Sequence, residues 1–179
     1  MRRLLAVAVV SLLAAACSAD TAGVTSVATV PDHERGGANA IVERVVDGDT
    51  IVVDINGSRE RVRLLGIDTP ESVAVNRPEQ CYGRESAAYL TSLLPKGTGV
   101  TLARDIESRD QYDRLLAYVV RSFDQLFVNL DLLERGYAGV MIYEPNSFHR
   151  ELFEEAENDA FRAGTGLWGV CGGPDVPLG

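Results

Sequence analysis

The chain has 179 residues, with 17 lysines and arginines against 26 acidic side chains, and its formal net charge is −9 at pH 7. This length fits one globular domain that can bury a core of ordinary size. The acidic balance excludes the broadly basic surface that most nucleic-acid-binding proteins carry. It favours a surface scaffold or interaction protein as one class of function.

The first 17 residues are typical of a bacterial export signal. Arg2 and Arg3 precede a run of apolar and small residues that is too short to span a bilayer as a stable helix. The run ends at Cys17, which resembles the lipidated cysteine of a bacterial lipoprotein signal. We therefore predict lipidation of Cys17 and anchoring to the bacterial cell membrane. Ordinary cleavage after Ala16 or Ala19, which would give a secreted protein, is the alternative.

Composition also divides the rest of the chain. Residues 18–39 are rich in Thr, Ala, Gly and Ser and predict a flexible linker, so the folded domain should span residues 40–171. Residues 172–179 contain two prolines and predict a disordered tail. Cys81 and Cys171 remain beyond the signal, and two such cysteines in an exported protein most often form a disulfide. Two separate thiols are the alternative, and no CxxC motif or histidine cluster indicates zinc.

The domain begins with three predicted strands, at residues 41–46, 50–55 and 59–65. Asn56 and Gly57 separate the second strand from the third, and this dipeptide is a strong signal for a two-residue hairpin turn.

This turn fixes a predicted register in which Ile51 faces Val62, Val53 faces Glu60 and Thr50 lies beside Arg63. The open end of the hairpin then gathers Asp49, Arg63 and the loop that contains Asp68. Strict alternation along the strands places Asp49 and Arg63 on opposite faces, so we expect a bulge, a twist or a longer turn there.

The remaining predicted elements are three helices, two strands and one extended segment. In chain order they are a helix over residues 79–94, strands over 100–104 and 115–120, a short helix over 127–135, an extended segment over 137–143, and a helix capped by Ser147 that ends at Gly164.

The last helix has a predicted apolar face. Phe148, Leu152, Ala156 and Ala160 follow helical spacing, and His149 is expected at the surface.

Three polar segments carry the chemistry of the chain. They are DGDT at residues 47–50, RLLGIDTPE at 63–71 and DQYDRLLAY at 110–118. In this order and at this spacing they resemble the staphylococcal nuclease (thermonuclease) family, and the later YEPN and GLW segments agree. The resemblance covers residues 40–170. It implies an α+β, mainly β fold: a five-stranded OB-fold barrel with three helices.

The resemblance also implies an activity. A member of this family would be a calcium-dependent phosphodiesterase that hydrolyses DNA and/or RNA with little sequence specificity and leaves 3′-phosphate ends. The metal ligands would be the carboxylates of Asp49 and Asp68 and the backbone carbonyl of Thr69. Hard oxygen ligands of this kind suit Ca²⁺.

The remaining roles come from the same resemblance. Glu71 would orient or activate the attacking water, and Arg63 and Arg114 would bind the phosphate through their guanidinium groups. Tyr112 and Tyr143 match positions that contact an outer phosphate of the nucleotide.

Taken one at a time, these residues have simpler interpretations. The aspartates could be turn residues, Glu71 a solvated surface acid, the arginines exposed strand residues and the tyrosines barrel packing. The alternative function is a non-catalytic OB-fold module that binds nucleic acid or a protein partner at the cell surface.

The chain departs from the family at three positions. Gln111, Asp113 and Met141 stand where the founding member has a lysine, a glycine and a tyrosine, which bears on substrate affinity and base preference. Asp113 could also pair with Arg114 and weaken its contact with phosphate. We expect nucleic acid as the substrate, a monomer without an obligate protein partner, and contact with a membrane only through the N-terminal lipid.

Overall fold

The structure, a computed structural model, describes residues 37–72 and 79–178. The predicted signal peptide, Cys17 and most of the predicted linker lie outside the described residues. The last part of that linker already contacts the domain, because Asn39 donates its backbone N–H to the carbonyl of Val100 at 3.0 Å. Within the described ranges no helix has the length and apolar character needed to cross a membrane.

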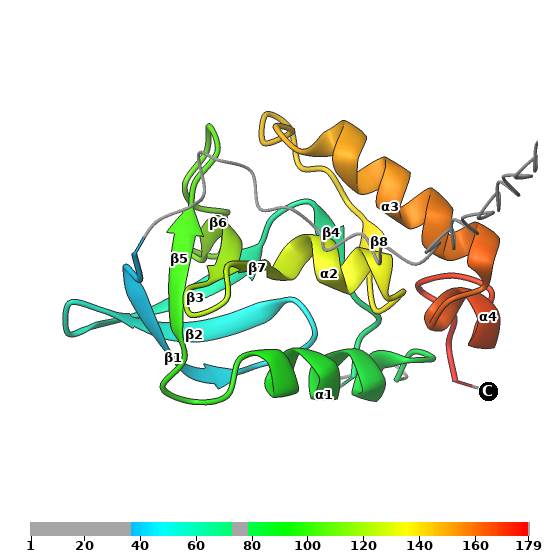
Figure 1. The fold of residues 1–179 in the computed structure, drawn as a ribbon, viewed down its shortest axis with the longest axis horizontal. Helices are drawn as coiled ribbons and strands as arrows, with labels where there is room; N and C mark the ends of the chain where they lie inside the picture. The colour runs from blue at the N-terminus through cyan, green and yellow to red at the C-terminus, as the bar shows by residue number, and fades with distance from the viewer. Residues whose placement is uncertain (1–36, 73–78, 179) are drawn as a thin grey trace, which may run out of the picture.

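Five strands close into a barrel (Figure 1). Neighbouring strands are hydrogen-bonded in the order β3-β2-β1-β5-β6, and a parallel pairing of β3 with β6 closes the ring. This confirms the predicted five-stranded OB-fold barrel. The strands are β1 (Ala40–Val45), β2 (Thr50–Ile55), β3 (Ser58–Leu64), β5 (Gly99–Ala103) and β6 (Leu115–Arg121).

Three short strands extend this barrel. The strand β7 (Leu126–Phe127) pairs with the end of β6. The strands β4 (Ile67–Asp68) and β8 (Gly139–Val140) form a separate antiparallel pair. Asp68 belongs to β4 and pairs with Gly139 of β8, so this pairing fixes the backbone of Asp68 shortly after β3 ends.

The predicted hairpin register is confirmed. Ile51 pairs with Val62, and Thr50 pairs with Arg63. Asn56 and Gly57 have φ values of 53° and 86°, the left-handed conformation that a tight type I′ turn requires at both central positions. The turn chemistry alone therefore set which residues of β2 and β3 lie side by side.

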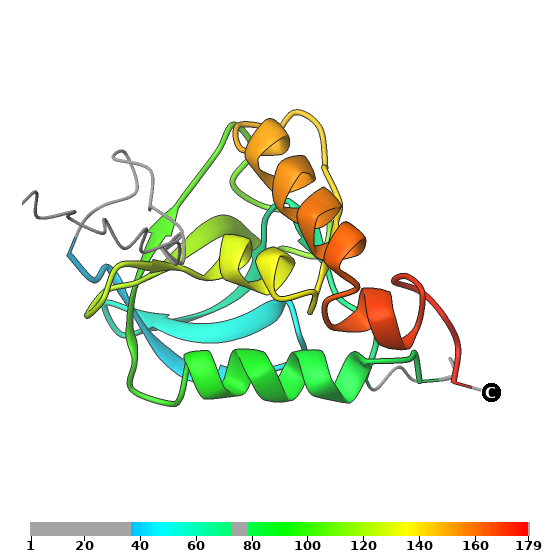
Figure 2. The ribbon, with the colours of Figure 1, turned by 45° about the vertical axis from the view of Figure 1, so that its right-hand side comes forward.

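Helices pack around one side of the barrel, with α2 lying between α1 and α3 (Figures 1 and 2). Their bounds are α1 (Gly83–Leu93), α2 (Val128–Glu134), α3 (Arg150–Ala163) and the short α4 (Leu167–Val170). The core joins the inner faces of the strands to apolar side chains of α1, α2 and α3, including Leu90, Leu132 and Phe153. These helices complete the core of the barrel.

The last helix differs from its prediction. It begins at Arg150 with His149 as N-cap, so Ser147 is not the cap. Phe148 lies before the helix and is exposed, whereas Phe153 is fully buried. His149 is only 5% exposed and packs edge-on against the ring of Tyr118, so the expected surface position was wrong.

The C-terminal segment also differs from its prediction. Residues 172–178 are not a free tail but run beside residues 79–81. Cys81 donates its backbone N–H to the carbonyl of Val176 at 2.7 Å, and Leu178 donates to Glu79 at 2.9 Å. This contact delays the start of α1, which we predicted four residues earlier.

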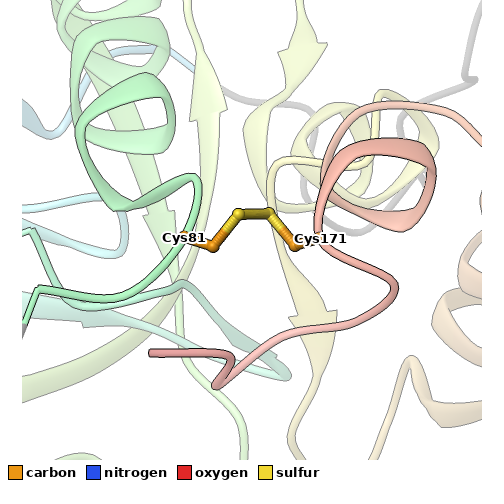
Figure 3. The surroundings of a disulfide bond; sticks show 2 residues. All are labelled: Cys81 and Cys171. Carbon is orange, nitrogen blue, oxygen red and sulfur yellow. A yellow bond between two sulfur atoms is a disulfide. The ribbon is translucent and has the colours of Figure 1, made fainter. Parts of the chain in front are cut away.

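The predicted disulfide is present in the structure. It joins Cys81, before α1, to Cys171, after α4, with a Cα–Cα distance of 6.0 Å (Figure 3). The bond closes a loop between residues 90 positions apart and links the start of α1 to the C-terminal segment.

Candidate functional site

The DGDT and RLLGIDTPE segments meet where β2 begins and β3 ends. Gly48 lies directly against Thr69, and a Cβ at Gly48 would lie 2.5 Å from Thr69 Oγ1. Asp49 sits in the bend before β2 starts at Thr50. Side chains alternate between the two faces of a sheet only within a strand, and Asp49 lies outside β2. Its carboxylate can therefore lie on the same face as Arg63.

Arg63 is the centre of this group. Its Nε lies 3.3 Å from Asp49 Oδ1, and its Nη2 donates to Asp68 Oδ1 at 2.7 Å. Its Nη1 donates to the carbonyls of Leu64 and Ile67, both at 2.7 Å. The side chain is 5% exposed, so Arg63 is not the exposed strand residue of the simpler interpretation. It is a fixed guanidinium that bridges the two predicted metal-binding carboxylates.

Asp49 is held on both carboxylate oxygens. Its Oδ2 accepts hydrogen bonds from the backbone N–H and the hydroxyl of Thr69, at 3.2 and 3.1 Å, and its Oδ1 accepts from Thr50 Oγ1 at 3.0 Å. The residue is 7% exposed. All three predicted metal-binding residues, Asp49, Asp68 and Thr69, thus lie in one small region.

Negative charge is concentrated in this region. Burial raises the pKa of Asp68 to about 6; Arg63 opposes this shift, and the charges of Asp49, Asp175 and Glu71 add to it. Burial also raises the pKa of Asp47 to about 6, with a further contribution from Asp49. Carboxylates crowded in a poorly solvated place are less costly when a cation is bound.

The donor set fits a hard cation. Asp49 and Asp68 supply carboxylate oxygens and Thr69 a carbonyl, which are the ligand types that Ca²⁺ and Mg²⁺ take. In the described part of the chain, no group of three or more His, Cys, Asp or Glu side chains is arranged to hold a metal ion. The fit therefore rests on the two carboxylates of Asp49 and Asp68 and on the carbonyl of Thr69.

Arg114 reaches the site through the parallel pairing of β3 with β6, in which Val62 pairs with Leu115. Its Nε donates to Asp110 Oδ2 at 2.7 Å, and its backbone N–H donates to Asp110 Oδ1 at 2.9 Å. Burial raises the pKa of Asp110, but these hydrogen bonds outweigh that effect, and the pKa lies below its usual value. The pair uses only Nε of the guanidinium.

Asp113 does not form the ion pair with Arg114 that the sequence suggested. Its carboxylate lies 3.4 Å from Arg109, and Arg109 also donates to its backbone carbonyl at 2.8 Å. Asp113 has a φ of 61°, which a glycine would adopt more easily. The turn is therefore retained, and the partner of Arg114 is Asp110.

A cavity of about 370 Å³ lies beside the acidic region. Tyr112 and Tyr143 line it and are 70% and 49% exposed, so they are not buried barrel packing. The full lining is Arg63, Glu107, Asp110, Gln111, Tyr112, Arg114, Leu116, Tyr143 and Glu144. Sequence reasoning assigned no role to Glu107, Asp110 or Glu144, although the i, i+4 spacing of Asp110 and Arg114 was a visible signal for their pair. Two arginines and two aromatic hydroxyls on one cavity can hold a phosphate ester.

Glu71 lies at the exposed edge of the acidic region. Its backbone N–H donates to Gln80 Oε1 at 2.6 Å, and its carbonyl accepts from the backbone N–H of Gln80 at 2.9 Å. The backbone of Glu71 is thus fixed while its carboxylate faces solvent near Asp68. Gln80 had no motif to mark it in the sequence.

Comparisons with known proteins agree with this arrangement. The family model described as "Staphylococcal nuclease homologue" matches residues 61–170. The chain is 41% identical over 132 residues to a thermonuclease of Staphylococcus intermedius, covering 74% of this chain and 77% of that protein. It is 37% identical over 127 residues to a thermonuclease of Staphylococcus hyicus, covering 71% and 73% respectively.

A third relative is named as an endonuclease. Endonuclease YncB of Bacillus subtilis is 36% identical over 135 residues, covering 75% of this chain and 63% of that protein. A closed barrel with an acidic cluster, two arginines on one cavity and these relatives define the class: the chain belongs to the staphylococcal nuclease family.

Proposed function

We propose that this protein is a nuclease that hydrolyses phosphodiester bonds in DNA and/or RNA, with calcium, with little sequence specificity and leaving 3′-phosphate ends. Membership of the family and the thermonucleases and endonuclease among its relatives support hydrolysis of nucleic acid. Calcium and the 3′-phosphate product come from the family resemblance.

One observation carries the proposal. Arg63 bridges Asp49 and Asp68 and also lines the cavity that contains Arg114. A phosphate in that cavity would therefore lie between two guanidinium groups and beside the carboxylates that suit a cation. This is the arrangement that phosphodiester hydrolysis needs, because negative charge builds up on the phosphate oxygens as water attacks.

Each residue then has a role. Asp49, Asp68 and the carbonyl of Thr69 would hold calcium, which when bound neutralises a phosphate oxygen. Glu71 orients the attacking water and accepts its proton. As the oxygen of water bonds to phosphorus, the bond from phosphorus to the 5′ oxygen breaks, that oxygen takes up a proton from solvent, and the phosphate stays on the 3′ side.

The cavity residues hold the substrate. Arg63 and Arg114 stabilise the charge that develops on phosphorus-bound oxygens. Arg114 has Nη1 and Nη2 outside its pair with Asp110 and can present them to phosphate. Tyr112 and Tyr143 line the same cavity and would contact a neighbouring phosphate.

The second candidate is a non-catalytic OB-fold module that binds nucleic acid or a protein partner. The net charge of −9 is the observation that favours it, since an acidic protein attracts a polyanion poorly. Cleavage separates the two candidates.

The test is digestion of single- and double-stranded DNA and RNA by purified protein, with calcium and with a chelator. We expect cleavage with calcium, loss of cleavage with the chelator, and 3′-phosphate ends by mass spectrometry of the products. Absence of cleavage of all four substrates, with substrate still bound, would establish the binding module instead.

We also propose that the protein is exported and anchored through lipid on Cys17. The proposal rests on the N-terminal residues alone. Cys17→Ser should release the protein from the membrane fraction of cells without changing its activity. A wild-type protein that is already free of membrane and starts at an unmodified Cys17 or at Asp20 would show ordinary signal cleavage.

A further inference from the structure

Gln80 links the C-terminal segment to the candidate site. This residue lies between Glu71 on one side and Asp175 on the other. Gln80 is not among the residues to which the proposed reaction gives a role.

Gln80 forms hydrogen bonds with both polar groups of the Glu71 backbone. Its side-chain Oε1 accepts the N–H of Glu71 at 2.6 Å, and its own N–H donates to the carbonyl of Glu71 at 2.9 Å. Gly83 at the start of α1 leaves room for this carbonyl, because a Cβ there would lie 2.5 Å from its oxygen. The two hydrogen bonds therefore fix the peptide groups on either side of Glu71.

Gln80 is in turn fixed by the C-terminal segment. Its Nε2 donates to Asp175 Oδ1 at 3.0 Å, and Gln80 pairs with Pro177 in an antiparallel bridge. The neighbouring residue, Cys81, is bonded to Cys171 (Figure 3). The amide of Gln80 thus uses its oxygen for Glu71 and its nitrogen for Asp175, so the C-terminal segment sets the orientation of the amide.

We propose that Gln80, oriented by Asp175, is a positioning residue that holds Glu71 where its carboxylate can meet the attacking water near Asp68. This inference rests on the proposed nuclease function. The carboxylate of Glu71 is exposed and gains no fixed position from burial. Its place is set by its backbone, and a displaced base loses rate because it no longer meets the water at the right distance and angle.

The first test compares Gln80→Ala with wild type by single-turnover cleavage and by binding of a short non-cleavable nucleotide analogue. Turnover should fall roughly 10- to 100-fold, while analogue binding changes by less than about threefold, because Glu71 does not grip substrate. Asp175→Ala should give a smaller fall in the same direction. Asn158→Ala, which removes an exposed amide from α3, is the matched control and should behave as wild type.

A double-mutant cycle distinguishes positioning from a general structural effect. If Gln80 acts through Glu71, adding Gln80→Ala to Glu71→Gln should cost little further rate. An equal fractional loss in both backgrounds would overturn the proposal, as would wild-type turnover of Gln80→Ala.

Amide hydrogen exchange gives a readout that does not depend on activity. The Glu71 N–H should exchange faster in Gln80→Ala than in wild type, with the core strands unchanged. Unchanged exchange at Glu71 would overturn the proposal even in a protein that cleaves nothing. A wild type that fails to cleave, with faster Glu71 exchange in the variant, would instead overturn the nuclease function and leave the contact established. If Gln80→Ala does not fold, the same three measurements are made on Asp175→Ala.

Discussion

At the scale of single residues, Arg63 organises the candidate site. Its guanidinium is 5% exposed, donates to Asp68 and to two backbone carbonyls, and forms an ion pair with Asp49, so its loss would leave buried charge and buried carbonyls without partners. Arg114 differs, because only its Nε is engaged by Asp110. In the proposed function, Arg63 therefore has two roles: it stabilises the fold and it binds phosphate. The proposed role of Arg114 is to bind phosphate.

Glu71→Gln tests the role of the proposed base. Turnover should fall by at least about 100-fold, the scale for loss of a general base. Binding of a short substrate analogue should hardly change, since the amide keeps the size of the side chain. Single-turnover cleavage and analogue binding, measured beside wild type with calcium, check both. Wild-type cleavage by the variant would remove Glu71 from the mechanism.

Asp49→Asn and Asp68→Asn test the cation site. Each removes one formal charge at nearly constant size, so calcium-supported cleavage should be lost in both while the circular dichroism spectrum is kept. Asp49→Asn should also lower the melting temperature more, because Asp49 is buried and holds Thr69 as well as Arg63. Calcium titration by calorimetry supplies the direct measurement. Two variants that bind calcium as wild type does would show that the ligands lie elsewhere.

At the scale of elements, the helix α3 supports the site loop through one close contact. Gly66, between β3 and β4, lies against the ring of Phe153, which is fully buried. A Cβ at Gly66 would lie 2.4 Å from Phe153 Cε2, a distance that forces one of the two to move. The turn at Gly66, between β3 and β4, is thus packed against a residue of α3, which is far away in the sequence.

Gly66→Ala should therefore destabilise the domain by more than the strain that a positive φ causes in alanine. Gly57→Ala is the matched control: both glycines have positive φ, 77° and 86°, but nothing lies within 4 Å of a Cβ at Gly57. We expect about 1 kcal/mol for Gly57→Ala and roughly 2 kcal/mol more for Gly66→Ala. Urea unfolding of the two variants measures the difference, and equal midpoints would mean that the Phe153 contact relaxes without cost.

Local chemistry explains which elements the sequence predicted correctly. The Asn56-Gly57 turn determined the register of β2 and β3 because both residues accept positive φ. The face of α3 could not be predicted as well, because Phe148 and His149 precede the helix. Phe148 is exposed, whereas the burial of His149 depends on packing against Tyr118 and not on helical spacing.

Contacts between distant segments explain what the sequence missed at the site. The pair of β4 with β8 and the bridge between Gln80 and Pro177 join residues that lie far apart in the chain. The spacing of a motif carries no signal for such partners. The polar residues of the three motifs were brought together as predicted, but the bridging hydrogen bonds of Arg63 depend on the bend at Asp49, which alternation within a strand does not describe.

At the scale of the whole molecule, charge separates this protein from a typical nucleic-acid binder. The net charge is −9, so attraction for a phosphate backbone must come from the few guanidinium groups at the cavity. Long-range repulsion and local attraction then act in opposite directions, and salt screens the long-range part first.

The dependence of kcat/KM on salt should accordingly be shallow. A protein with about 6 to 10 phosphate contacts loses roughly 10³- to 10⁵-fold in affinity between about 50 and 200 mM salt. We expect less than about a tenfold change here, measured on a short oligonucleotide at fixed free calcium. A steep fall would reveal a broader cationic surface than the described residues supply.

The disulfide links the start of α1 to the segment after α4, and its loss should lower the stability of the domain. In the chain-entropy model, a bond between residues 90 positions apart contributes on the order of 4 kcal/mol, because the unfolded chain is constrained by the closed loop. The double variant Cys81→Ser/Cys171→Ser should therefore melt lower by roughly 10 °C, as measured by calorimetry. Alkylation of unreduced wild type followed by mass spectrometry should find neither cysteine free. Two reactive thiols in native protein, or an unchanged melting temperature in the double variant, would show that the bond does not stabilise the native protein.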